Sequence, residues 1–291
     1  MIDFLKSIGF TDAEQAEYLK YKKIAVPEAA FYAKSFMQGN MPFCEAAEKS
    51  RTMLLPHMHE YTADLLFLTE CASLLREKYI KSGIDLDIYT DTMKDLKYKL
   101  DECKKVKGIF GNFVSWWYRE FFEMERFALG RLQYDIREYS GEDVIVKGFE
   151  IKKGDFILAC HIPSSGPLTR EECMASYKKA YEFFKHRLRG NILPVVCSTW
   201  LFFPPYESVF GENSNTVKFA HDFEPVKVEE TEKFNDSWRI FGVKYEDDAD
   251  ILPTKTSLQK KFVDYIKEEK PFGLATGILL FDGERVMTER K

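Results

Sequence analysis

The spacing of apolar residues changes near residue 125, and this change restricts the possible folds more than any other feature of the chain. Upstream, apolar residues recur at intervals of three and four, as in Met58, Tyr61, Leu65, Leu68, Ala72, Leu75 and Tyr79. Downstream, the intervals become two, as in Ala128, Gly130, Leu132, Tyr134 and Ile136. The first period is that of one helix face and the second is that of one strand face. The sequence therefore predicts a helical part followed by a part that contains a β-sheet.

Two longer helices are expected in the helical part. One apolar stripe runs from Met58 to Tyr79 and ends at Gly83, and a second runs from Tyr89 to Cys103 and ends at Gly108. Nearer the start, Thr11 and Glu14 have the spacing of a capping box, in which each side chain bonds the other residue's amide. Such stripes are typical of a packed core.

The second part reads as mixed α and β. Residues 144–151 lie between two turn clusters and are predicted to form a strand of an antiparallel meander, and the nearly continuous apolar run 155–162 is predicted to form a central strand. A helix is expected from Thr169 to about Arg189. The remaining predicted elements are a strand at 192–203, a helix near 206–221, a strand pair around 226–243, a helix at 257–267 and a buried strand at 272–281.

Composition narrows the functional class. The chain has 291 residues, 45% of them hydrophobic, and a formal net charge of −5, which argues against a nucleic-acid partner. Its first residues lack a signal-peptide pattern and no stretch approaches the roughly 20 apolar residues of a membrane span, so we expect a cytoplasmic protein with no membrane partner. Its oligomeric state is not predicted.

The cysteines and histidines do not predict a metal site. The six cysteines are scattered without a CxxC pair, which is typical of reduced thiols in the core. His57 and His59 are two residues apart, and on a helix they would point about 200° away from each other, so they could not share one ion.

The segment that carries chemistry is the turn from Pro163 to Leu168, between the central strand and the helix that opens at Thr169. A small-residue turn before a helix leaves amide groups pointing outward, which suits a phosphate. Ser164 and Ser165 add hydroxyl groups, and Gly166 allows a ligand to approach the backbone closely. The alternative is an ordinary strand-to-helix loop that uses glycine and serine only to turn.

Three sequence blocks carry a resemblance to a known family. They are His161-Ile-Pro-Ser-Ser-Gly-Pro-Leu168, Cys197-Ser-Thr-Trp-Leu-Phe-Phe-Pro204 and Asn213-Ser-Asn-Thr-Val-Lys-Phe219. They resemble a bacterial family of acyltransferase-domain proteins, which pair a helical N-terminal domain with a C-terminal domain like the GNAT N-acyltransferases. The resemblance implies an α+β fold, with a helical domain at 1–124 and, at 125–291, a mixed sheet with helices on both faces.

The resemblance also implies a reaction. The expected function is transfer of an acyl group, acetyl in the simplest case, from acetyl-CoA or another acyl-CoA to a small-molecule amine or a peptide, with no metal. The pyrophosphate of CoA would lie on amides of Ser164, Ser165 and Gly166, with Thr169 and Asn213 as further contacts. The strands that hold His161 and Cys197 would splay apart, so that backbone amides could polarise the thioester.

Acyl transfer to an amine needs a base for the amine and an acid for the departing thiolate. His161 is a candidate base or substrate contact, and a structural histidine is the alternative. Glu125, with Glu123 beside it, is a candidate base carboxylate or a solvated acid. Tyr206 is a candidate general acid or a core residue. Trp200 and Cys197 are candidate substrate contacts, with core packing as the alternative for Trp200.

Two rival functions stay open. The turn has one glycine and also Pro167, which favours a GNAT-like domain that has lost CoA binding and serves as a small-molecule or protein-binding module. Alternatively, Cys197 could be the nucleophile of a hydrolase with His161 or His221 nearby. The apolar neighbours of Cys197 disfavour this second possibility, since a thiol buried among them is inert.

Overall fold

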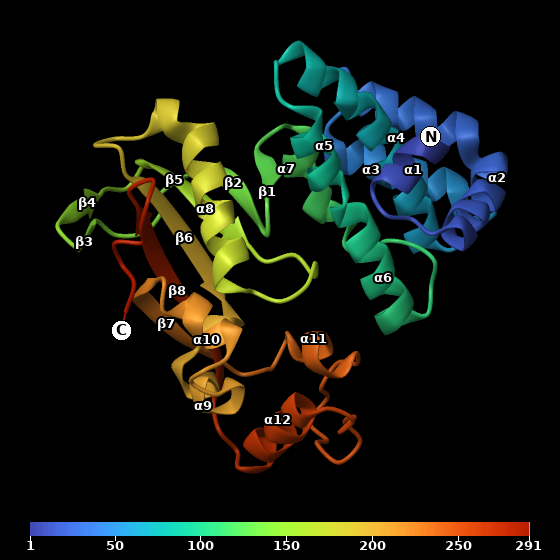
Figure 1. The fold of residues 1–291 in the computed structure, drawn as a ribbon. Helices are drawn as coiled ribbons and strands as arrows, with labels where there is room; N and C mark the ends of the chain where they lie inside the picture. Colours follow the sequence, from blue (N-terminus) through green and yellow to red (C-terminus); the bar gives the residue numbers. More distant parts are fainter. Residues whose placement is uncertain (291) are drawn as a thin grey trace. The chain divides into compact units, whose positions relative to one another are not determined.

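A computed structural model describes residues 1–290, apart from the side chains of residues 25, 26 and 28. The chain divides into two compact units, Met1–Leu129 and Gly130–Lys291. Figure 1 shows the first as helices coloured blue to green and the second as a sheet with helices coloured green to red. Among the described residues, no helix is long and apolar enough to cross a membrane.

The first unit is built from helices and ends in one short strand. Its elements are α1 (Ile2–Ser7), α2 (Asp12–Met37), α3 (Phe43–Leu54), α4 (Glu60–Lys81), α5 (Leu86–Met93), α6 (Asp95–Lys107), α7 (Arg119–Phe122) and β1 (Arg126–Leu129). The predicted capping box is confirmed at the start of α2, where the Thr11 and Glu14 side chains each accept from the other residue's amide. The predicted stripe lies on α4 from Tyr61 to Tyr79, with Met58 just before the helix, and its residues are buried except for half-buried Tyr61.

The second predicted stripe is buried as well, but it is carried by two helices. The chain breaks at Lys94, which ends α5 and precedes α6. Asp95 opens α6 with a negative charge in its first turn, which favours a new helix start. Gly108 ends α6 in the left-handed conformation, with φ of 69°.

The second unit holds most of the sheet. Its elements are β2 (Leu132–Glu138), β3 (Val144–Val146), β4 (Phe149–Ile151), β5 (Phe156–His161), α8 (Arg170–Phe184), β6 (Leu193–Thr199), α9 (Glu207–Phe210), α10 (Asn215–Ala220), β7 (Glu224–Thr231), α11 (Ser237–Phe241), α12 (Ser257–Lys267) and β8 (Phe272–Phe281). Its main strands are hydrogen-bonded in the order β2-β5-β6-β8-β7. Only the β5–β6 pair in this run is parallel. The expected fold class, a helical part followed by a mixed sheet with helices, is therefore confirmed.

Two local predictions were wrong. Residues 144–151 form a separate two-stranded hairpin of β3 and β4, not a single strand, because Lys147 and Gly148 both adopt positive φ and close a tight turn. The predicted strand pair around 226–243 is one strand, β7, followed by the short helix α11. That helix ends at Gly242, whose left-handed conformation stops it.

Candidate functional site

The central parallel strands β5 and β6 separate soon after they meet. Their pairing covers only Leu158 with Val195 and Ala159 with Val196. Beyond this point β5 continues to His161 along β2, and β6 continues to Thr199 along β8. The facing main-chain edges of β5 and β6 therefore stop bonding each other at the carboxyl ends of the strands, where ligands of open α/β sheets commonly bind.

The turn after β5 projects into solvent between two buried anchors. Residues 164–167 are exposed, whereas Pro163 and Leu168 are buried. Gly166 has φ of +127°, a conformation that essentially only glycine adopts, and a Cβ placed there would meet no atom within 4 Å. The turn thus offers its backbone to a ligand without a side chain in the way.

The amides of this turn are not all available. The Ser165 amide donates to the Pro163 carbonyl oxygen at 2.8 Å, so the exposed hydroxyl is what this residue presents. The predicted contact of Ser165 with CoA stays a prediction. Among the described residues, the amides of Gly166 and Leu168 have no intramolecular acceptor. These two amides form a strip without internal acceptors that leads into the helix start.

The strip continues into the N-terminus of α8. Thr169 is the N-cap, and its hydroxyl oxygen accepts from the Glu172 amide at 3.3 Å. The same hydroxyl donates to the Glu172 carboxylate at 2.7 Å, so the side chain of Thr169 is occupied by capping. The Arg170 guanidinium pairs with the buried carboxylate of Asp222 and ties this helix end to the residues after α10.

Arg131, which the sequence prediction missed, holds the turn from behind. Its guanidinium is buried, and it donates to three carbonyl oxygens of the turn: Pro167 at 2.9 Å, Pro163 at 3.0 Å and Gly166 at 2.6 Å. Three bonds from one rigid planar group fix the turn as a unit.

His161 lies beside a second missed residue, Asp135. The imidazole Nε2 is 3.1 Å from Asp135 Oδ2, and the side chains are 28% and 1% exposed. The strand register explains the pair. Asp135 on β2 stands opposite Ala159 on β5, and Ala159 is two residues before His161. The side chains of Asp135 and His161 therefore lie on the same face of adjacent strands. Arg137 donates to the same Oδ2 at 2.9 Å. The buried carboxylate of Asp135 therefore lies at ion-pair distance from the Nε2 edge of the imidazole.

Cys197 lies in the core at the point of strand separation and is 1% exposed. Its neighbour across the gap is Cys160, whose thiol pKa is raised well above its ordinary value by burial and by the adjacent Cys197 thiol. A buried thiol that a reagent cannot reach is a poor nucleophile, and Cys197 is buried beside Cys160.

Tyr206 and Trp200 belong to one aromatic cluster. Tyr206 is completely buried, and its hydroxyl accepts from the Gly273 amide at 3.4 Å. Burial raises the pKa of this phenol. The ring of half-buried Trp200 lies 6.1 Å from that of Tyr206 and 5.7 Å from that of Phe210. Both side chains therefore have packing roles that account for their positions.

The other predicted residues are more peripheral. Glu125 is half-buried in the first unit, where its amide donates to the Glu120 carbonyl oxygen at 2.9 Å, and its role as a base stays a prediction. Asn213 is exposed in the turn before α10, a helix that packs against α8, and its contact with CoA also stays a prediction. His59 caps α4, because its Nδ1 accepts from the Tyr61 amide at 3.1 Å.

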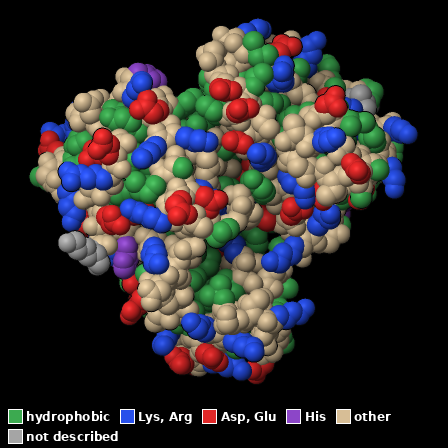
Figure 2. Space-filling model, viewed as in Figure 1, with side chains coloured by type: hydrophobic (Ala, Val, Ile, Leu, Met, Phe, Trp, Pro, Cys, Tyr) green, Lys and Arg blue, Asp and Glu red, His purple; other side chains and the backbone are tan. Residues whose placement is uncertain are grey.

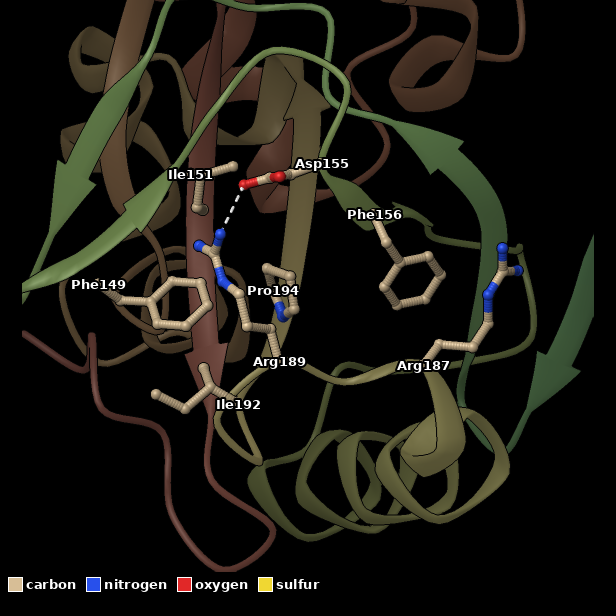
Figure 3. A pocket seen from close by; sticks show the side chains of 8 residues that line it. All are labelled: Phe149, Ile151, Asp155, Phe156, Arg187, Arg189, Ile192 and Pro194. Atoms are coloured by element: carbon tan, nitrogen blue, oxygen red, sulfur yellow. Dashed lines mark ion pairs between the residues drawn. The ribbon is translucent and has the colours of Figure 1, made fainter.

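A small cavity lies at the opposite ends of the central strands. Figure 3 shows the rings of Phe149 and Phe156 on either side of Pro194, with Arg189 paired to Asp155 at 3.3 Å. Its volume is about 60 Å³. Ligand pockets usually hold roughly 300–1,000 Å³. The cavity is therefore too small for a pantetheine chain, and it lies near the starts of β5 and β6 instead of their separating ends.

The surface charge is mixed. On the face drawn in Figure 2, lysine and arginine side chains alternate with aspartate and glutamate.

Family comparisons cover both units. Residues 127–279 match the family model of the GNAT-like C-terminal domain, and residues 1–124 match that of the N-acyltransferase N-terminal domain. No curated protein matches the chain.

Several solved structures have the same fold. An acyltransferase in complex with decanoyl-CoA and teicoplanin is 18% identical, covers 95% of this chain and 86% of its own, and has a TM-score of 0.70. An acyltransferase in complex with CoA and 10C-teicoplanin is 17% identical, with the same coverage and TM-score. An acyltransferase mutant in complex with octanoyl-CoA is also 17% identical, with the same coverage and TM-score. At these identities the likeness establishes the fold.

Proposed function

Because the chain belongs to the GNAT-like C-terminal domain family, we propose that it is an acyl-CoA-dependent N-acyltransferase that acts on an amine. The amides of Gly166 and Leu168 and the first turn of α8 bind the pyrophosphate of CoA. The acyl thioester lies where β5 and β6 separate. His161, oriented by Asp135, takes the proton of the attacking amine.

The observation that carries this proposal is the position of the turn. The amides of Gly166 and Leu168, which have no intramolecular acceptor, lie in the turn that directly follows β5, the strand that separates from β6 after Ala159. A pyrophosphate on that strip directs the rest of CoA along the gap between the strands. The open space around Gly166 fits such a group, because even a Cβ built on this residue would meet no atom within 4 Å.

The chemistry follows from the side chains at the gap. The amine nitrogen attacks the thioester carbonyl carbon, a C–N bond forms, and the C–S bond breaks to release the CoA thiolate. Asp135 favours the tautomer in which Nε2 carries hydrogen, so Nδ1 of His161 is the nitrogen that accepts the amine's proton. That proton, or one exchanged for it, ends on the thiolate.

The similar solved acyltransferases support a proposal for the acyl chain and the acceptor. One is a complex with decanoyl-CoA and teicoplanin, one with octanoyl-CoA, and one with CoA and 10C-teicoplanin. We therefore propose that medium-chain acyl-CoAs, as well as acetyl-CoA, are donors, and that the acceptor is an amine on a small molecule or peptide.

Calorimetric titration with acetyl-CoA, octanoyl-CoA and decanoyl-CoA tests the proposal, followed by assay of CoA thiol release with a panel of amines. Ser165→Asp should weaken CoA binding about tenfold or more, because a carboxylate would face phosphate. Ser140→Asp is the matched control, since Ser140 is exposed and follows the end of β2 far from His161 in the β2–β5 register. Binding equal to wild type in both variants would place CoA elsewhere.

The rival function has a distinct result in the same experiment. A domain that has lost CoA binding gives no heat and no thermal shift with any of the three acyl-CoAs. That result would remove the enzyme proposal and leave the binding module.

A further inference from the structure

We propose that Arg131 is the positioning residue that makes the turn after β5 a pyrophosphate site, an inference that rests on the proposed function. Arg131 precedes β2 and is 8% exposed. Three of its nitrogens, Nε, Nη1 and Nη2, each donate to a different carbonyl oxygen of the turn. It touches no group that reacts, so its effect on CoA is exerted through the backbone.

These bonds decide which way the turn's amides point. In a planar trans peptide the C=O and the N–H point in opposite directions, and the described chain has no cis peptide bond. The Pro163 carbonyl faces Arg131, so the Ser164 amide points away from it. The Pro167 carbonyl also faces Arg131, so the Leu168 amide points away as well. The guanidinium thereby directs both amides away from itself, and of the two the Leu168 amide has no intramolecular acceptor among the described residues.

The same bonds remove a repulsion. A carbonyl oxygen carries partial negative charge and would repel a phosphate oxygen if it faced the ligand. Arg131 draws the carbonyls of Pro163, Gly166 and Pro167 inward. Because a guanidinium stays protonated at all ordinary pH values, this arrangement is permanent.

Lysine cannot replace this function. An ammonium group is a compact point donor, whereas the three bonds to the turn use the fixed fork of the guanidinium. Arg131→Lys keeps the charge and loses the geometry, so the amides are no longer held in one orientation. The affinity for the pyrophosphate should fall, while binding of the acyl-pantetheine part, which lies along the strands, should not.

Titrations of the full chain with CoA and with S-octanoyl-pantetheine, which has no pyrophosphate, test this role. Arg131→Lys is expected to raise the Kd for CoA about tenfold or more and to change that for octanoyl-pantetheine by less than about twofold. Arg189→Lys is the matched control, because Arg189 also donates to a carbonyl oxygen, that of Glu150, and should leave both affinities unchanged. A folded Arg131→Lys protein with wild-type CoA affinity, or with equal losses for both ligands, overturns the inference.

A measurement on the unaltered protein covers the case in which the variant does not fold. In NMR titrations with CoA, the amide signals of Gly166 and Leu168 are expected to shift, and that of Ser165, already bonded to Pro163, is expected to shift least. An unchanged Leu168 signal in a protein that binds CoA overturns the inference. Absence of any CoA binding by wild type instead contradicts the proposed function itself.

Discussion

The imidazole of His161 and the carboxylate of Asp135 form a pair in which Nε2 and Oδ2 are 3.1 Å apart. The carboxylate is almost completely buried, and Arg137 holds it from the other side. The pair joins the last residue of β5 to the face of β2 that also carries Arg137. Strand β2 thus supplies Asp135, which orients the proposed base. Arg131, which holds the turn proposed to bind pyrophosphate, immediately precedes β2.

Removing Asp135 should impair the chemical step more than substrate binding. For Asp135→Ala we expect kcat to fall about tenfold or more, and for His161→Ala about a hundredfold or more, with the KM for octanoyl-CoA changed by less than about threefold. The double variant should be no slower than His161→Ala alone, since the carboxylate acts through the imidazole. Thiol release with the most active amine of the panel gives these values.

A measurement without substrate distinguishes a role of Asp135 in orienting His161 from a role in the stability of the protein. Nitrogen-15 NMR of wild type should show the His161 tautomer with hydrogen on Nε2, and Asp135→Ala should shift the population toward the Nδ1 tautomer. Asp143→Asn, in the turn before β3, is the control and should leave both the tautomer and kcat unchanged. An unaltered tautomer in Asp135→Ala would remove the positioning role.

The sequence predicted the apolar face of β2 and missed the polar one. The apolar residues of this segment, Leu132, Tyr134 and Ile136, are spaced by two. They alternate with polar residues that have the same spacing: Arg131, Gln133, Asp135 and Arg137. Alternation of this kind normally means one buried and one solvated face. Here Gln133 and Asp135 are buried, and Asp135 is paired with Arg137 on its own strand and with His161 on β5. His161 is distant from Asp135 in sequence, so spacing alone could not reveal this pair.

The turn between β5 and α8 could also be predicted only in part from the sequence. Small residues between a strand and a capped helix predicted an exposed loop with a positive-φ glycine at 166, and the structure has both. The bond from the Ser165 amide to Pro163 could not be predicted, because it depends on backbone angles that Arg131 and the two prolines set together.

Substitution of Gly166 should weaken CoA binding beyond its effect on stability. Gly166→Ala places a Cβ in a conformation that costs about 1–3 kcal/mol for other residues, although no atom would clash with it. Gly190→Ala is the control, because Gly190 also has positive φ and an open surrounding. Urea unfolding should show a lower free energy of unfolding for both variants. Calorimetry should show about a tenfold or greater loss of CoA affinity only for Gly166→Ala. Equal CoA affinity in the two variants would contradict the proposed site.

Alkylation distinguishes acyl transfer by direct attack from a cysteine mechanism. Cys44 is exposed, whereas Cys160 and Cys197 are buried and adjacent. Iodoacetamide should modify Cys44 first, as mass spectrometry of peptides can show, and Cys197→Ala should keep at least about a third of wild-type kcat. Early labelling of Cys197 together with an inactive Cys197→Ala protein would favour the hydrolase.

The first unit should lose stability in acid through Glu14. Burial alone would raise the pKa of this carboxyl, but the Thr11 amide and the ammonium groups of Lys104 and Lys97 outweigh it and lower the pKa to about 2. The folded pKa lies below the ordinary value of 4.5, so this stabilisation is complete above pH 4.5 and is lost as the pH falls toward 2.

Urea unfolding of Glu14→Gln across this pH range checks the sign. The variant should be less stable than wild type at pH 7, and the difference should shrink between pH 4.5 and 2. A difference that stays constant, or that grows in acid, would show that the ion pairs do not stabilise the fold.

A crystal structure of the chain with bound CoA tests the central claim most directly, because it locates the pyrophosphate. The account predicts pyrophosphate oxygens at about 2.7–3.2 Å from the amide nitrogens of Gly166 and Leu168, with the pantetheine chain between β5 and β6. Pyrophosphate held at another place, or bound there only by charged side chains, would contradict it.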